Sequence, residues 1–226
     1  MNRKKPRREN IYEGKTVEAM VEQTYNYDKF LKNQMTEEIC YLRRSICCWR
    51  RVAGDGNCFY RSAIFAWLEY LIFTKKIHVF DIIIANIYSK FNPSYINTKI
   101  LNKEIQKQFI SQEKDITIAI LEIIKRQLTN NNIKEAYYIL LKSFNASRIF
   151  DRNMIFYLRY LLYEFILENK NKLFSKDFPV LLGNLLPEEY ETNDGQFLFD
   201  NYFAKDLLKF YTCAEKLAVY LTPYVF

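Results

Sequence analysis

The chain has 226 residues and a mass of 27.3 kDa, which is the size of a single domain with or without a tail. Half of its residues are apolar and 17% are aromatic, so it can bury a substantial core and is not disordered throughout. With only 5 Gly and 5 Pro it is not a turn-rich β-sandwich or barrel. Its most apolar stretches, 62–73 and 156–167, are too short to span a membrane and contain charges, so we expect no membrane partner.

The excess of positive charge is concentrated at the N-terminus. The net charge is +7, but five of the 33 basic residues fall within positions 3–8, and the rest balance as 28 basic against 26 acidic residues. We therefore predict a basic disordered tail at 1–10 and a nearly neutral folded body at 11–226. Nuclear entry and weak polyanion binding by the tail are alternatives to a simple solubilising role, and we expect no other nucleic-acid binding.

The cysteine content indicates a reducing compartment. The number of cysteines is odd, and the N-terminus has no apolar signal sequence, so we expect a cytoplasmic protein, with the nucleus as the alternative. None of the cysteines has C-x-x-C spacing, and the only histidine is His78, so we predict no metal site. The five cysteines are Cys40, Cys47, Cys48, Cys58 and Cys213.

In chain order, loose helical spacing predicts one or two helices within 11–45. Gly54, Asp55 and Gly56 then mark a tight turn with unusual backbone angles. From Cys58 onward apolar residues recur at helical spacing for about four turns. The sequence contains no Gly or Pro from there until Pro93, so we place His78 at the far end of the same helical stretch. Asn57 stands where a side chain would cap that helix.

The rest of the chain is also predicted to be mostly helical. Helical periodicity in 79–128 breaks near 92–93, residues 130–132 form a polar loop, and 178–195 is rich in loop-forming residues. The apolar residues 220–226 need a cover, and they predict marginal folding or self-association. The further helices that we predict are 133–144, 154–167 and 203–219.

One stretch, G-D-G-N-C-F-Y-R-S at 54–62, carries recognisable chemistry. A cysteine at the first position of a helix lies at the positive end of the helix dipole, which favours the thiolate. The preceding turn can direct several backbone N–H groups to one side, where they would stabilise the oxyanion formed when the thiolate attacks a carbonyl. A small buried cysteine on an ordinary core helix remains the alternative.

These residues resemble the nucleophile motif of the OTU-fold deubiquitinases, and most closely that of the otubain branch, D-G-N-C-F-Y-R-A. A second segment, F-Y-L-R-Y-L-L at 156–162, is similar to the otubain helix that contains Y-L-R-L-L. The resemblance covers about residues 40–226 and is strongest near Cys58. It implies the α-rich part of an α+β papain-like cysteine peptidase, with most of the family's sheet missing.

The resemblance also implies a function. Cys58 would be the nucleophile, and Asp55, Gly56 and Asn57 would form the oxyanion turn. The reaction would be hydrolysis of isopeptide bonds after the C-terminal glycine of ubiquitin, so the partners would be ubiquitin and ubiquitinated proteins. No metal or organic cofactor is implied.

The sequence departs from the family at the general base. The family's catalytic histidine lies near the C-terminal end of the domain, but no histidine follows His78 here. In a continuous helix His78 would lie roughly 30 Å from the thiol. We therefore expect a C-terminally incomplete domain, which would be either part of an active deubiquitinase or an inactive relative that binds ubiquitin or other partners. An unrelated helical interaction module is the third possibility.

Overall fold

The computed structural model describes residues 11, 15–16, 48–90, 111–170, 182, 186, 190, 198–209 and 211–226. The contacts divide the chain into two compact units, Met1–Ala53 and Gly54–Phe226. The tail predicted at 1–10 lies outside the described residues, and the single domain predicted at 11–226 stays a prediction.

The first unit contains a short antiparallel ladder. Strand β1 (Lys15–Thr16) pairs with β2 (Cys48–Trp49), with Lys15 opposite Trp49. Ile11 forms a further antiparallel bridge with Val52 and is fully buried. The helical prediction for 11–45 is therefore wrong at β1, where strand pairing prevails over helical spacing. Residues 17–47 lie outside the described part of the chain.

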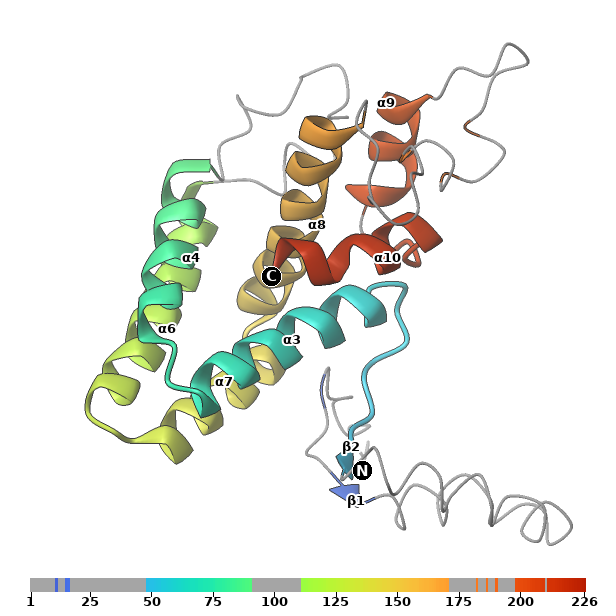
Figure 1. Ribbon diagram of the computed structural model, residues 1–226. Coiled ribbons are helices and arrows are strands. Elements are labelled where there is room, and N and C mark those ends of the chain that lie inside the picture. The colour runs from blue at the N-terminus through green and yellow to red at the C-terminus, as the bar shows by residue number, and fades with distance from the viewer. Residues whose placement is uncertain are drawn as a thin grey trace, which may run out of the picture. The chain divides into compact units, whose positions relative to one another are not determined.

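The second unit is helical, which confirms the prediction of a mostly α chain. α8 lies in its middle and packs against α3, α6, α7 and α10 (Figure 1). Its buried positions surround the helix because neighbours cover it on several sides. The elements of this unit are α3 (Cys58–Phe73), α4 (Ile77–Lys90), α6 (Ser111–Thr129), α7 (Ile133–Ala146), α8 (Arg148–Asn169), α9 (Phe199–Tyr202), the π-helix η4 (Phe203–Leu207) and α10 (Lys216–Val225).

The stretch predicted to run on from α3 is two helices. Lys75 adopts the left-handed conformation with φ 54°. The Lys76 N–H donates to the Leu71 carbonyl at 2.9 Å and the Lys75 N–H to the Ile72 carbonyl at 3.2 Å, the pattern of a Schellman motif. The single-helix prediction is wrong because this motif ends α3 without the glycine that usually marks it.

The loop predicted at 130–132 is confirmed, and it uses the same motif. Asn131 is left-handed with φ 61°, and the Asn132 N–H donates to the Gln127 carbonyl at 2.8 Å. The Lys75 ammonium donates to the Asn131 side-chain oxygen at 2.7 Å. The two left-handed residues that end α3 and α6 therefore meet.

Two other helix predictions have different outcomes. The helix predicted at 133–144 is confirmed as α7. The one predicted at 154–167 begins earlier, at Arg148, because the Ser147 hydroxyl accepts from the Phe150 N–H at 3.1 Å and caps α8.

The prediction of a single helix at 203–219 is wrong. α9 and η4 end at Leu207, Tyr211 is left-handed with φ 63°, and α10 begins only at Lys216. Hydrogen bonds of the intervening residues to Asn57 and Arg159, described below, compete with helix continuation. In α10, Leu217, Ala218 and Leu221 are buried, while marginal folding or self-association stays a prediction.

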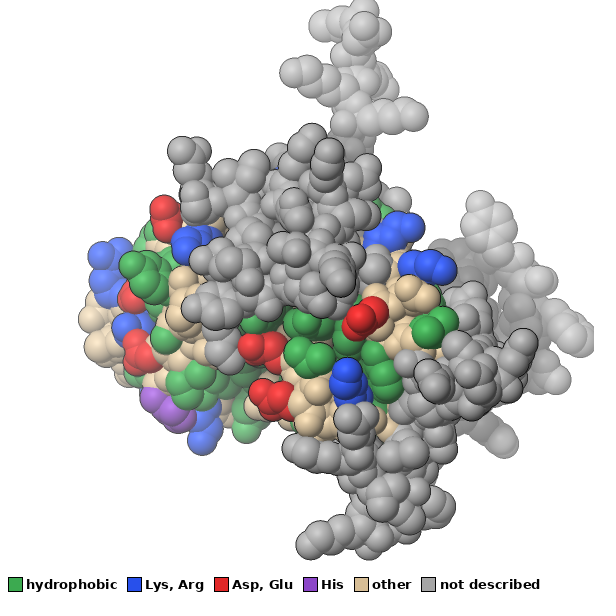
Figure 2. Space-filling model, turned by 90° about the horizontal axis from the view of Figure 1, so that it is seen from above, with side chains coloured by type: hydrophobic (Ala, Val, Ile, Leu, Met, Phe, Trp, Pro, Cys, Tyr) green, Lys and Arg blue, Asp and Glu red, His purple; other side chains and the backbone are tan. Residues whose placement is uncertain are grey.

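The surface in Figure 2 carries acidic and basic side chains interspersed with apolar ones over the described residues. No helix in the described part of the chain is long and apolar enough to cross a membrane.

We predict that Phe144→Ala lowers the free energy of unfolding by about 3–5 kcal/mol. Phe144 is fully buried on α7, and its ring meets the rings of Phe65 and Phe150 edge to face at centroid distances of 5.3 and 5.2 Å. Tyr138→Ala on the same helix removes an exposed ring and should change stability by about 0.5 kcal/mol at most. Urea unfolding of both variants checks this, and equal losses would contradict it.

Candidate functional site

The turn before α3 brings Cys58 to the first position of that helix. Gly56 has φ 83°, which glycine adopts without strain, and the Asn57 N–H donates to Asp55 Oδ1 at 3.0 Å. Cys58 is half-buried, and its thiol forms no disulfide. The first N–H groups of a helix have no intrahelical acceptor, so this end of α3 attracts negative charge.

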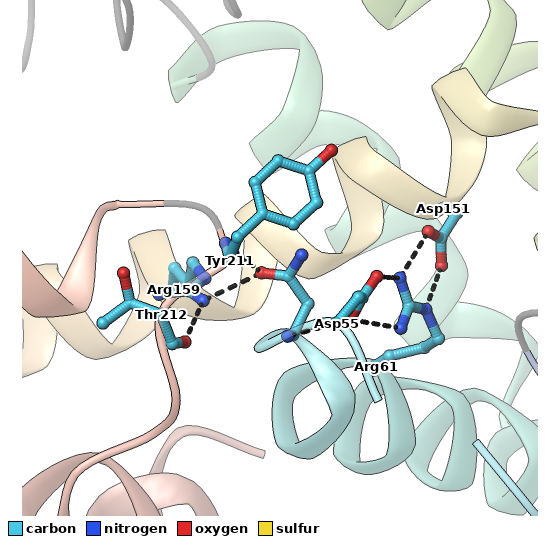
Figure 3. Close-up of polar contacts among 7 residues, drawn as sticks. Asp55, Arg61, Asp151, Arg159, Tyr211 and Thr212 are labelled. Atoms are coloured by element: carbon cyan, nitrogen blue, oxygen red, sulfur yellow. Dashed lines mark hydrogen bonds and ion pairs between the residues drawn. The ribbon is translucent and has the colours of Figure 1, made fainter. Parts of the chain in front are cut away.

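Two carboxylates hold the guanidinium of Arg61, a residue of the first turn of α3. Its Nη1 and Nη2 donate to the two oxygens of Asp55 at 3.0 and 2.7 Å. Its Nε and Nη2 donate to the two oxygens of Asp151 on α8 at 2.7 and 2.9 Å (Figure 3). Because the Arg61 side chain is only 2% exposed, this cluster ties the turn to α8 largely out of contact with water.

Burial and charge shift the pKa values of the two carboxyl groups in opposite directions. Burial acts to raise the pKa of Asp55, but hydrogen bonds from Arg61 and the Asn57 N–H outweigh it and hold that pKa below its ordinary value. Asp151 is 7% exposed against 32% for Asp55, and burial raises its pKa despite Arg61. Burial also acts to lower the pKa of Arg61, but both carboxylates raise it further, so Arg61 stays charged.

The Asn57 side chain connects the turn to two other segments. Its Oδ1 accepts from Arg159 Nη2 on α8 and from the Tyr211 N–H, each at 3.0 Å (Figure 3). It makes no capping hydrogen bond to α3. The prediction that Asn57 caps α3 through its side chain is wrong, because a buried cation is a stronger donor than a helix N–H.

The backbone of Tyr211 lies directly against Gly56. A Cβ atom on Gly56 would lie 2.2 Å from the Tyr211 carbonyl oxygen, so only glycine leaves room for this approach. Arg159 Nη2 also donates to the carbonyl of the next residue, Thr212, at 2.9 Å. The chain at 211–212 is thus held against the turn.

The structure does not bring His78 to the thiol. His78 is exposed at the second position of α4. Cys58 begins α3, whose 16 residues span about 24 Å. The hydrogen bond from the Lys76 N–H to the Leu71 carbonyl keeps the start of α4 at the opposite end of α3.

The described residues contain no group of three or more His, Cys, Asp or Glu side chains that could hold a metal. Cys213 is exposed and forms no disulfide, while Cys40 and Cys47 lie outside the described residues. Two hollows lie elsewhere, one lined by Lys170 and 198–201, the other by residues of 214–220.

Several partners of the turn had no sequence signal. Arg159 belongs to the segment at 156–162 that resembles the otubain helix, but nothing there indicates its contact with Asn57, 102 residues away. Asp151 and Tyr211 lie 90 and 154 residues from the groups that they bind. Local periodicity carries no information about such pairs.

Comparison with known protein families shows which family the chain belongs to. The family model for peptidase C65, otubain, matches residues 8–177. The chain belongs to the otubain family. The match includes the whole turn at 54–57, α3 and α8, so the family prediction made from the motif is confirmed.

Solved structures share the fold of this otubain. A complex of ceOTUB1, ubiquitin aldehyde and UBC13~Ub has a TM-score of 0.60 at 16% identity, covering 96% of this chain and 74% of that chain. A complex of h/ceOTUB1, ubiquitin aldehyde and UBCH5B~Ub has a TM-score of 0.54 at 14% identity, covering 96% and 72%. These likenesses confirm the predicted OTU fold class. No curated protein sequence matches the chain significantly.

We predict that Gly56→Ala destabilises this otubain by about 1–2 kcal/mol from the left-handed backbone alone, and by more because Tyr211 must move. Gly54→Ala is the matched control, since a Cβ atom there would have nothing within 4 Å, and its effect should stay within about 0.5 kcal/mol. Thermal unfolding of the two variants measures the difference. Equal stability of both variants would contradict both the backbone strain at Gly56 and the close contact with Tyr211.

We also predict that Arg61→Met lowers the free energy of unfolding by about 3–5 kcal/mol at pH 7, because it leaves Asp151 buried without its cation. Adding Asp151→Leu should recover much of that loss, since an apolar pair of similar size replaces the ion pair. Arg148→Met, an exposed change on α8, is the control. Urea unfolding tests this, and an Arg61 variant as stable as the control would refute it.

Proposed function

We propose that this otubain is a thiol-dependent deubiquitinase in which Cys58 attacks the carbonyl carbon of the C-terminal glycine of ubiquitin. The observation that carries the proposal is the place of Cys58, at the start of α3 on a turn held by buried polar contacts. Membership of the otubain family, and the solved ceOTUB1 complexes with ubiquitin aldehyde, support ubiquitin and ubiquitinated proteins as partners.

The reaction has two steps. The Cys58 sulfur bonds to the carbonyl carbon, the C–N isopeptide bond breaks, and the thiol proton ends on the departing lysine amine. Water then hydrolyses the thioester, which releases ubiquitin with a free carboxylate and restores the thiol. No metal or organic cofactor takes part in this scheme.

The donor that we propose for the oxyanion is the backbone N–H of Cys58, with that of Gly56 beside it. The Asn57 N–H already donates to Asp55. Within the turn, Asp55 and Asn57 therefore shape the backbone, while Gly56 allows an extended peptide to come close. The assignment of all four residues to the site remains a proposal.

A second candidate is a ubiquitin-binding relative that hydrolyses little. The observation in its favour is the position of His78, the only histidine in the sequence, at the opposite end of α3. A cysteine enzyme without a positioned base loses most of its reaction rate. Binding and oxyanion stabilisation then leave only a small residual rate. For either candidate we propose a cytoplasmic location, with nuclear entry through the basic tail as the alternative.

We predict that ubiquitin carrying a C-terminal propargylamide forms a covalent adduct with the protein, seen as a gain of one ubiquitin in intact mass. Cys58→Ser should abolish the adduct. Cys213→Ser should retain it, because Cys213 is an exposed thiol of the same unit without the helix position of Cys58. An adduct that depends on Cys213, or none at all, would refute the nucleophile assignment.

The two candidates separate on hydrolysis and binding. For the enzyme, cleavage of isopeptide-linked diubiquitin should fall by at least about 1,000-fold in Cys58→Ser. For the binding relative, cleavage should be undetectable while calorimetry with Cys58→Ser still detects ubiquitin binding. Neither cleavage nor binding would remove both candidates.

A further inference from the structure

A single buried side chain contacts the segments that surround the nucleophile turn. Arg159, on α8, is fully buried. Its Nη1 donates to the backbone carbonyls of Asp206 and Leu207 at 3.0 and 2.7 Å. Its Nη2 donates to Asn57 Oδ1 at 3.0 Å and to the Thr212 carbonyl at 2.9 Å. The guanidinium thus joins α8, the turn, the end of η4 and the chain at 212.

The surroundings of the Arg159 side chain stabilise a positive charge and fix the plane of the guanidinium. Asp206 and Leu207 are the last residues of η4, where a helix presents partly negative carbonyl groups. On α3, the Tyr60 ring lies 3.7 Å from Arg159 Cζ, a cation–π contact in a desolvated place. Acceptors on two edges and a ring on one face leave the guanidinium little freedom to rotate.

Tyr60 is the residue between Phe59 and Arg61 in the first turn of α3, two positions after the nucleophile. Its ring is 1% exposed, and burial raises the pKa of its phenol to about 12, so it is neutral at pH 7. Arg159 therefore contacts α3 just after Cys58, through Tyr60, and the turn just before it, through Asn57.

We propose that Arg159 is a positioning residue for Cys58, which acts through the Asn57 amide and the carbonyl of Thr212 to keep the turn in the shape that stabilises an oxyanion. The inference rests on the proposed function of Cys58 and deepens it. Asn57 immediately precedes the nucleophile, so a shift of its backbone moves the Cys58 N–H. The hold on 212 keeps Tyr211 against Gly56.

A positioning role and a merely structural role predict different measurements. If Arg159 only fills and satisfies the core, its replacement reduces the fraction of folded protein, and each folded molecule reacts as before. If Arg159 positions Cys58, folded molecules of the variant react more slowly than those of the wild type, because a displacement of about 1 Å at a reacting centre can cost about 100-fold in rate. Recognition of the rest of ubiquitin should then stay unchanged.

The experiment compares Arg159→Met with the wild-type chain and with Arg148→Met, an exposed control on the same helix. Adduct formation with the ubiquitin propargylamide probe gives a maximal rate and a half-saturating concentration for the folded fraction. We expect Arg159→Met to lower the maximal rate by about 100-fold and to change the half-saturating concentration by less than about twofold. An unchanged maximal rate per folded molecule would overturn the proposal.

Two further variants sharpen the test. Arg159→Lys keeps the charge but not the planar fork, so it should not restore the rate. Asn57→Ala removes the amide oxygen that accepts from Arg159 and from the Tyr211 N–H, and we expect about a tenfold loss of the maximal rate. If Arg159→Met does not fold, this variant decides. A rate equal to wild type in Asn57→Ala, or full recovery in Arg159→Lys, would count against positioning through the amide.

A measurement that does not depend on the reaction of Cys58 distinguishes this proposal from the proposed function. Hydrogen exchange of the peptide 54–60 should be faster in Arg159→Met, while that of 133–146 in α7 should stay the same. If the wild-type chain never labels but exchange changes in this way, the deubiquitinase proposal fails and the hold on the turn stands. If labelling occurs and exchange of 54–60 does not change, the positioning proposal fails and the enzyme stands.

Discussion

Two buried arginines need hydrogen-bond acceptors, and this requirement gives the turn at 54–57 its shape. Moving a guanidinium out of water costs several kcal/mol unless oxygens surround it. Arg61 finds two carboxylates, and Arg159 finds one side-chain amide and three backbone carbonyls. Few arrangements of the chain satisfy all of these groups at once, so a glycine turn with little stiffness of its own is held in one conformation.

The two arginines differ in the hydrogen-bond acceptors that surround their guanidinium groups. Arg61 lies between two carboxylates, so its positive charge is compensated nearby. The four hydrogen bonds described for Arg159 run to neutral oxygens, three of them backbone carbonyls. Burial lowers the pKa of Arg159, while the nearby carboxylates of Asp55 and Asp206 act to raise it, so its charge is partly compensated as well. Under the proposed function, the positive end of α3 would favour the negative charge that develops on an attacked carbonyl oxygen.

The geometry of the turn and the transfer of a proton are separate requirements. The polar contacts around Asp55 and Asn57 join α3 to α8 within the core, so a chain that only binds ubiquitin would need them as much as an enzyme would. Hydrolysis needs a proton acceptor beside the thiol as well, and His78 is remote from it. A well-formed turn therefore supports the otubain architecture more strongly than it supports turnover.

The sequence by itself determined what depends on neighbours along the chain. Apolar residues at helical spacing predict α7 and the start of α3, the polar run at 130–132 predicts the end of α6, and the contiguous motif around Cys58 indicates the family. It misplaced the end of α3, because Lys75 adopts a conformation that a lysine rarely takes, and it joined η4 to α10.

Only the tertiary structure decided which groups hold the turn before Cys58. Asn57 has the sequence position of a helix cap, yet its oxygen binds Arg159 and Tyr211 instead of α3. Asp151 is indistinguishable in the sequence from a surface carboxylate at the start of a helix. The physical reason is that a buried charge takes its partners from whatever the fold brings within hydrogen-bonding distance, and that distance is unrelated to separation along the chain.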